Sequence, residues 1–243
     1  MKSSAAHLTA RAASPQNPGY WSELILSRAV PAAFFSLFIA EKLLLTYASI
    51  DALGHPRHNE PFGAYMFALN QVLGLVYFTL IVVLFIVRLP RSGGRRGVGT
   101  VVVAFFGTFA MLLAALLPSV EPRPSLIVAS NVLLAAGLGY SIWSLAYLGR
   151  SLSILPEARR LVTTGPYGVS RHPLYLGEAV ASIGVVIPTI ALEGGVLIGL
   201  FLLAQLIRIR WEEQVLIQHF PMEYASYRRR VPRYLPDLGK LFR

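Results

Sequence analysis

The chain has 243 residues, of which 55% are hydrophobic and only 14% are charged, and its mean hydropathy is +0.57. So few charged groups cannot cover a soluble globule of this length, and the composition therefore favours an integral membrane protein. The chain has no cysteine, which excludes disulfides, thiolate nucleophiles, palmitoyl anchors and thiolate metal ligands. Any chemistry therefore uses oxygen and nitrogen groups or comes from a cofactor.

The apolar segments predict an all-α fold, a polytopic bundle of transmembrane helices. Crossing a hydrocarbon core of about 30 Å takes roughly 20 helical residues. Four runs are long enough, namely 29–50, 64–87, 98–117 and 125–148. A fifth run, 174–211, is interrupted by Pro188 and by Gly194-Gly195. We expect it to form a hairpin of two helices, the first of them short, which makes about six membrane segments.

Three parts of the chain follow from these segments. Residues 1–28 lack the apolar region of a cleavable signal peptide, so we expect a cytoplasmic arm and a first span that acts as the insertion signal. Residues 29–148 hold four transmembrane helices. Residues 149–243 are expected to hold a polar motif loop, the helix hairpin and a cytoplasmic helical tail.

The charge distribution predicts the orientation. With a cytoplasmic N-terminus and six spans, all 22 Lys and Arg residues fall on the cytoplasmic side except Arg57, Arg123 and Lys42. This follows the positive-inside rule, so the net charge of +10 reflects topology and attraction to anionic lipid. No basic and aromatic pattern typical of nucleic-acid recognition is present. The loop 149–173 and the tail 212–243 would share one side and build one site, while the hairpin tip, 191–195, would face outward.

Two charged residues, Glu41 and Lys42, lie near the middle of the first span. Adjacent residues on a helix do not face each other, so each is expected to need its own partner. Asn70 and Gln71 lie at a similar depth if the second span runs antiparallel. A structural hydrogen bond between the helices is the main interpretation, and contact with substrate is the alternative.

Polar residues gather where the fifth apolar run begins. Gly165-Pro166 redirects the backbone, and Pro173 suits the first turn of a helix, where its missing N–H costs nothing. Glu178 follows within that helix, and an unpaired carboxylate there costs a few kcal/mol, so we expect it to point into a protein cavity. Snorkelling to the surface, or a purely structural ion pair, is the alternative.

Arg171 and His172 precede this helix by about one turn. They could hold an anionic substrate and a polar group of a cofactor, respectively, while a contact of Arg171 with lipid headgroups is the alternative. His172 shows no metal-ligand spacing with the other histidines, and no metal site is predicted.

The end of the last apolar run carries a second polar cluster. Glu212 and Glu213 are suited to accept hydrogen bonds from an ammonium group or from ribose hydroxyls. Tyr224 and Tyr227 follow at helical spacing, ahead of three consecutive arginines. A solvated helix end, or a basic amphipathic tail lying on the membrane, would show a similar pattern.

These motifs form a series that extends over about residues 150–243. In chain order, the series is Leu-Val-Thr-Thr-Gly-Pro-Tyr at 161–167, then Arg171-His172-Pro173-x-Tyr175-x-Gly177, Glu212-Glu213, Phe220, Glu223-Tyr224-x-x-Tyr227, Arg230-Val231-Pro232 and Leu235-Pro236. This pattern resembles the isoprenylcysteine carboxyl methyltransferase and phospholipid methyltransferase group of integral membrane enzymes.

The resemblance implies a methyltransferase that takes S-adenosylmethionine and a lipophilic acceptor that enters between the helices. Arg171 would orient an acceptor carboxylate, such as a prenyl-cysteine-like group. The residues implied to bind the cofactor or to shape its pocket are Gly165, Pro166, Tyr167, His172, Pro173, Tyr175, Glu212, Glu213, Tyr224 and Tyr227. Independently of the resemblance, the cost of burial makes Glu178 the candidate general base if the acceptor is a thiol or an amine.

Several other functions remain open at this point. A phospholipid amine or a small thiol could be the acceptor. A membrane sterol or steroid reductase would use NADPH instead, although no dedicated clamp for a 2′-phosphate is evident. A non-catalytic transporter or lipid-binding protein could use Glu41, Lys42 and Glu178 along a path, but no inverted repeat is visible. The sequence predicts no particular oligomeric state.

Overall fold

A computed structural model describes residues 25–54, 61–90, 92–95, 97–117, 123–189 and 192–234. Within these ranges the chain is mostly helical, as predicted. The expectations for most of the N-terminal arm, for Arg57, for the tip of the hairpin at 190–191 and for the last nine residues lie outside the described residues.

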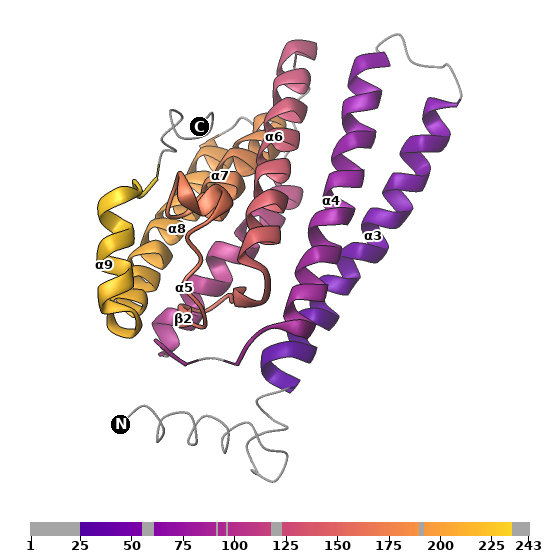
Figure 1. Cartoon of the computed structure of the whole chain (residues 1–243). Helices are drawn as coiled ribbons and strands as arrows, with labels where there is room; N and C mark the ends of the chain where they lie inside the picture. Colours follow the sequence, from indigo (N-terminus) through magenta and orange to yellow (C-terminus); the bar gives the residue numbers. More distant parts are fainter. Residues whose placement is uncertain are drawn as a thin grey trace.

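Among the described residues, four helices are long and apolar enough to cross a membrane. They are α3 (Val30–Leu53), α4 (Pro61–Val87), α6 (Pro124–Leu148) and α8 (Leu192–His219). The first three coincide with predicted spans, and a π-helical turn, Ile25–Ala29, leads into α3. Figure 1 shows α3 and α4 side by side at one edge of the molecule and α8 with the C-terminal helix at the other.

The third predicted span has a less regular structure than its composition indicates. Its α-helix, α5 (Val98–Phe109), has 12 residues, and a 3₁₀-helix, Ala110–Leu116, continues it. The α-helical part rises about 18 Å at about 1.5 Å per residue. The 3₁₀ part adds about 14 Å at about 2.0 Å per residue. Because the 3₁₀ part rises more per residue, the whole segment is about 32 Å long, which an α-helix would reach only with more residues.

The fifth apolar run breaks into two helices, as predicted. Helix α7 (Pro173–Val186) begins at the expected proline, and a 3₁₀ turn, Ile187–Thr189, ends it. Its main packing partner is α6 rather than α8. Small residues allow this approach, because a methyl group added to Gly137 or Gly177 would collide with the facing helix. Ser130 Oγ also donates a hydrogen bond of 2.7 Å to the carbonyl of Gly184.

Within the described ranges, the fold departs from all-α at one point, a two-stranded antiparallel ribbon. Strand β1 (Gly93–Gly94) pairs with β2 (Glu157–Ala158), which joins the loop after α4 to the loop after α6. Arginines hold the same junction: Arg28, Arg150 and Arg159 donate to backbone carbonyls at 86–89, the C-terminal end of α4. The carbonyls at a helix end have no partner within the helix, and these arginines supply one. The arginines therefore fix the loops against the end of α4, in addition to contributing to the positive-inside charge distribution.

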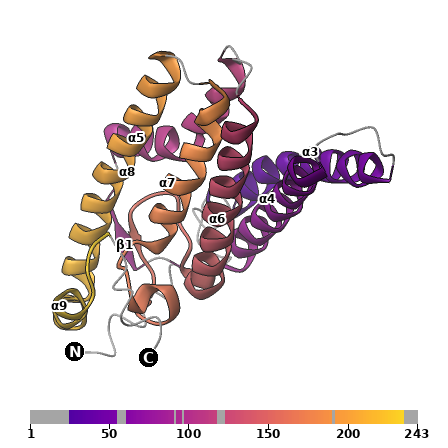
Figure 2. The same cartoon turned by 90° about the horizontal axis from the view of Figure 1, so that it is seen from above.

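The C-terminal helix α9 (Pro221–Arg230) packs on the protein. Tyr224, Tyr227 and Val231 are buried against Leu161, Leu216 and Phe220. The tail is therefore not a helix whose apolar face lies on the membrane. Figure 2 shows α9 at the end of α8, which brings the chain after α9 back toward the loop that precedes α7.

Candidate functional site

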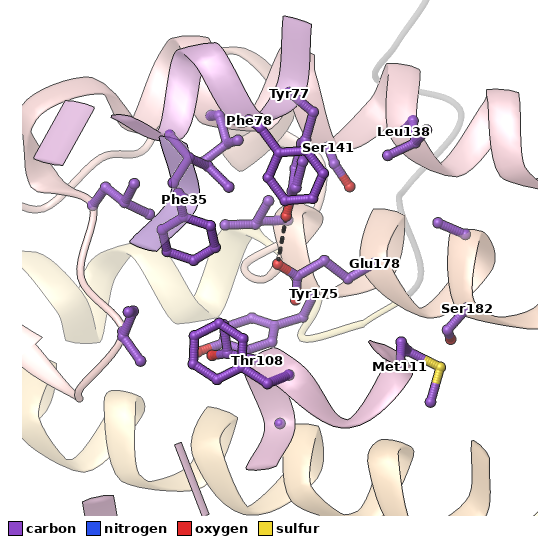
Figure 3. Close-up of a pocket in the computed structure, with 18 of the residues that line it drawn as sticks. Phe35, Tyr77, Phe78, Thr108, Met111, Leu138, Ser141, Tyr175, Glu178 and Ser182 are labelled. Carbon is purple, nitrogen blue, oxygen red and sulfur yellow. Dashed lines mark hydrogen bonds between the residues drawn. The ribbon is translucent and has the colours of Figure 1, made fainter. Parts of the chain in front are cut away.

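A cavity of about 400 Å³ lies between helices α3 to α8. Its walls are mainly aromatic and aliphatic, and Figure 3 shows Phe35 and Phe78 on one side and Met111 and Ser182 on the other. The charged side chains that line it are those of Glu41, Lys42, Glu157, Glu178, Arg208 and Glu212, together with the imidazole of His172. A long apolar space with a few polar groups suits a lipophilic ligand.

Glu178 points into this cavity, as its cost in an apolar helix predicts. The hydroxyl of Tyr77 donates to Oε1 at 3.1 Å, the bond drawn in Figure 3, and Gln205 Nε2 donates to Oε2 at 2.7 Å. Both carboxylate oxygens are thus hydrogen-bonded to side chains from two other helices.

Arg208 is bonded to this network, although its sequence position predicts only a contribution to the cytoplasmic positive charge. Its side chain is buried. Nη1 donates to Gln205 Oε1 at 2.7 Å, and the guanidinium lies 5.1 Å from the centre of the Tyr175 ring. Nε has no hydrogen-bond acceptor among the described residues. The signal that could have identified Arg208 is its spacing from Gln205, three residues apart on one apolar helix.

The motif loop has a conformation that depends on its glycine. Gly165 has a φ of +61°, in the left-handed region, and a side chain there would collide with the Tyr147 ring. A 3₁₀ turn, Gly165–Gly168, follows and buries Pro166 and Tyr167. Pro173 then begins α7. Gly165, Pro166 and Pro173 therefore shape the loop, and none of them lines either pocket among the described residues.

The C-terminal tail is bonded directly to this loop. The hydroxyl of Tyr227 donates to the carbonyl of Tyr167 at 2.7 Å. The amide of Arg171 donates to the carbonyl of Pro232 at 2.9 Å, and Ser170 Oγ donates to that of Tyr234 at 2.8 Å. Burial raises the pKa of Tyr167 and that of Tyr227 above their ordinary values, so both hydroxyls remain protonated at neutral pH.

Glu213 binds three cationic or potentially cationic groups. Arg171 Nη1 lies 2.8 Å from Oε1, His172 Nε2 lies 3.2 Å from the same oxygen, and Arg233 Nη2 contacts Oε2. The Glu213 side chain is only 6% exposed. One carboxylate thus holds the loop, α8 and the tail together.

A second, smaller pocket of about 50 Å³ lies at this junction. Six residues line both the small pocket and the large cavity, so the two spaces adjoin: Leu148, Ser151, Glu157, Tyr167, His172 and Glu212. Glu212 faces both spaces, whereas Glu213 lines neither among the described residues. Successive residues are about 100° apart around a helix, which separates the two adjacent carboxylates.

The remaining predicted site residues divide between the two spaces. Tyr175 lines the large cavity, while Arg171, Tyr224 and Tyr227 line the small pocket. Arg171 does not line the large cavity among the described residues, because its guanidinium is held by Glu213. The expectation that Arg171 orients the acceptor stays a prediction.

The charged pair in α3 also differs from expectation. Lys42 Nζ donates to Gln71 Oε1 at 3.2 Å, which is the predicted bond between helices. The adjacent residues nevertheless pair, because Lys42 Nζ lies 3.6 Å from Glu41 Oε1 once the flexible lysine chain turns back. Asn70 instead donates to Asn131 Oδ1 on α6 at 2.7 Å.

The fold and the site define a class of protein: a bundle of apolar helices with an internal apolar cavity that meets a polar pocket between a loop and a C-terminal tail. Comparison with known sequences agrees with this description. Residues 126–223 match the phospholipid methyltransferase family. This match begins in α6 and ends in α9, so it covers the motif loop, Glu212 and Glu213.

Three relatives illustrate the similarity. The chain is 33% identical to the nickel-cobalt-cadmium resistance protein NccN of Alcaligenes xylosoxydans xylosoxydans over 48% of this chain and 64% of NccN. It is 34% identical to the cobalt-zinc-cadmium resistance protein CzcN of Cupriavidus metallidurans over 60% of this chain and 65% of CzcN. It is 36% identical to protein-S-isoprenylcysteine O-methyltransferase B of Arabidopsis thaliana over 36% of this chain and 48% of the plant protein.

The chain thus spans just under two thirds of the two resistance proteins and about half of the plant enzyme. The family match and the plant relative confirm the resemblance to the isoprenylcysteine and phospholipid methyltransferase group that the motifs indicated. The apolar helices, together with this family, identify an integral membrane protein.

Proposed function

We propose that the protein is an S-adenosylmethionine-dependent methyltransferase that methylates a lipophilic acceptor, most simply a carboxylate such as a prenyl-cysteine-like group. The observation that carries this proposal is the wall shared by the two spaces, which includes Tyr167, His172 and Glu212. At about 50 Å³ the small pocket would take only the charged end of the donor, and the rest of the donor would extend toward the acceptor in the large cavity past these side chains.

The small pocket has groups that fit the charged methionine end of the donor. Its lining includes the Glu212 carboxylate, the guanidinium of Arg171 and the rings of Tyr167 and Tyr224. These match an ammonium, a carboxylate and a sulfonium cation, which aromatic faces also attract. Arg171 Nε and Ser151 Oγ are buried there with no described hydrogen-bond partner, so polar groups remain to be satisfied. When bound, the donor supplies an activated sulfonium methyl group.

To methylate a carboxylate, the protein needs mainly to align the acceptor with the methyl group of the donor and to exclude water. A C–O bond forms while the C–S bond breaks, and no proton moves because the acceptor is already ionised at neutral pH. Arg208 would orient the acceptor from inside the cavity, whereas Arg171 would bind the carboxylate of the donor. For the alternative amine or thiol acceptors, Glu178 is positioned to take the proton.

Glu213 would act through other residues rather than on the donor itself. By holding Arg171, His172 and Arg233, it fixes the position of the loop against the tail. Tyr224 and Tyr227 would close the tail over the donor. We place this junction and both termini on the cytoplasmic side, where the donor is available, because the positive-inside rule favours that orientation.

Two of the relatives are named for resistance to metal ions, and those names describe the relatives alone. The reductase and transporter alternatives gain no support from the comparisons, and a fluorescence titration with NADPH would test the first of them.

Isothermal titration of the purified full chain with S-adenosylhomocysteine tests the donor site. We expect saturable binding that weakens at least about tenfold, or roughly 1.4 kcal/mol, in Glu212→Gln. Glu223→Gln, a change at an exposed position of α9, is the matched control and should bind as the wild type does. No binding by the wild type, or equal binding by the Glu212 variant, would contradict the proposal. Radiolabelled donor with prenyl-cysteine, phosphatidylethanolamine, fatty acid and thiol acceptors then identifies the product class.

A further inference from the structure

The large cavity has a second polar end, remote from the motif loop. Glu41, Lys42, Asn70 and Gln71 line it there. Gln71 precedes Tyr77, which binds Glu178, by six residues on α4, or about 9 Å along the helix axis. Phenylalanine side chains line the space between the two ends, among them Phe38 and Phe78.

Lys42 reaches this space because α4 has a glycine opposite it. A methyl group on Gly74 would come within 3.3 Å of both Cδ and Cε of Lys42, so the absence of a side chain leaves room for the lysine chain. Nζ donates to Gln71 Oε1 at 3.2 Å. The nearest carboxylate oxygen, on Glu41, is 3.6 Å away, which is longer than a hydrogen bond. An ammonium has three donors, so hydrogen-bonding capacity remains toward the cavity.

The charge of Lys42 itself needs an explanation. An ammonium that faces hydrocarbon costs free energy, and the nearest carboxylate, that of Glu41, lies beyond hydrogen-bond distance and is half exposed. The hydrogen bond between α3 and α4 does not explain why residue 42 is charged. An uncharged side chain could bond to Gln71 and would avoid the cost of placing an ammonium at membrane depth.

We propose that this end of the cavity is a second binding subsite, which takes an anionic oxygen group, a carboxylate or a phosphate, at the far end of the acceptor. The acceptor is then two-ended. Its reacting group lies near His172 and Arg208, its apolar chain lies along the phenylalanines, and its distal anion binds Lys42. Glu41 is 52% exposed, so the cavity reaches the outer surface of the bundle beside this subsite. The inference rests on the proposed function for the identity of the reacting end.

Direct binding tests the subsite without turnover. The probes are fatty acids, α,ω-dicarboxylic acids and ω-phosphono fatty acids of matched chain length, titrated onto the full chain in nanodiscs. We expect wild-type protein to bind one of the two-ended series at least about tenfold more tightly than the fatty acid, at one preferred length. The two-ended series that shows this preference identifies the distal anion as carboxylate or phosphate.

Three variants localise the effect. Lys42→Met should remove the preference for the two-ended probe while leaving fatty acid binding unchanged, and Lys42→Arg should restore part of it because the charge is kept. Ser36→Ala, also on α3 but away from the cavity lining, should behave as the wild type. Equal affinity of wild-type protein for all probes, or an equal loss for all probes in Lys42→Met, would overturn the subsite.

A parallel titration with S-adenosylhomocysteine separates this proposal from the previous one. Donor binding without any preference for two-ended probes overturns the subsite and leaves the methyltransferase proposal standing. A Lys42-dependent preference without donor binding supports the subsite and contradicts the methyltransferase proposal.

Discussion

Glu178 and Arg208 line the same cavity, and both are hydrogen-bonded to the amide of Gln205, which lies between them. Gln205 donates to Glu178 Oε2 at 2.7 Å and accepts from Arg208 Nη1 at 2.7 Å. A direct ion pair would neutralise both groups, whereas the amide holds them apart. An acidic and a basic group therefore both remain directed into the apolar space.

Replacing Gln205 with alanine should break this arrangement. Both hydrogen bonds are lost, and Glu178 and Arg208 become free to pair with each other. We expect KM for the acceptor to rise or kcat to fall by roughly tenfold, about the effect of one or two buried hydrogen bonds, with little change in S-adenosylhomocysteine affinity. Steady-state methyl transfer and titration of the same preparation measure the two effects. Gln214→Ala, at an exposed position of the same helix, is the control, and a loss of donor affinity in Gln205→Ala would contradict the assignment.

The adjacent glutamates should differ in what they affect. Glu213→Gln removes the charge that holds Arg171, His172 and Arg233, so it should lower the free energy of unfolding by about 3 kcal/mol, as expected when a buried ion pair is broken. Glu212→Gln should weaken donor binding with a much smaller effect on stability. Thermal unfolding in detergent, measured beside donor titration, distinguishes the two. Equal stability of both variants would show that Glu213 does not hold the junction.

The contact between α6 and α7 should not tolerate side chains at its glycines. Gly177→Ala places a methyl group 2.9 Å from the carbonyl oxygen of Gly137, so we expect a destabilisation of about 1–3 kcal/mol. Gly139→Ala is the matched control, because a methyl group there meets no described atom within 4 Å. Alanine also has the higher helix propensity, so the control should be neutral or slightly stabilising. Thermal unfolding of both variants tests this, and similar destabilisation by the two would contradict close packing at Gly177.

Tyr227 should make stability sensitive to alkaline pH. Burial raises the pKa of Tyr227 above its ordinary value, which is about 10. Below that pH the folded and unfolded chains are both protonated, and the contribution is constant. Above it the unfolded chain ionises first, so stability falls as pH rises. Tyr227→Phe should cost about 1 kcal/mol at neutral pH through the lost bond to the Tyr167 carbonyl. Its stability should also decline less above pH 10, and unfolding measured across the alkaline range checks both effects.

Local patterns allowed much of the fold to be predicted. The starts of α7 at Pro173 and of the motif turn at Gly165 depend on backbone chemistry that proline and glycine carry with them. Helix α5 shows what composition cannot predict. The chain changes to 3₁₀ winding after Phe109, and hydropathy does not distinguish 3₁₀ from α-helical winding. The pairing of Gly93 with Ala158 joins distant loops and had no local signal.

By itself, the sequence determined that the chain crosses a membrane, that its polar motifs gather at one end of the bundle, and that Glu178 points into the interior. Those conclusions depend on the cost of exposing polar groups to hydrocarbon, which is a property of each residue and its immediate neighbours. Only the tertiary structure decided which polar groups meet. It separated Glu212 from Glu213, assigned Arg171 to the small pocket and brought Arg208 into the large one, because the direction of a side chain depends on how each helix is rotated against its neighbours.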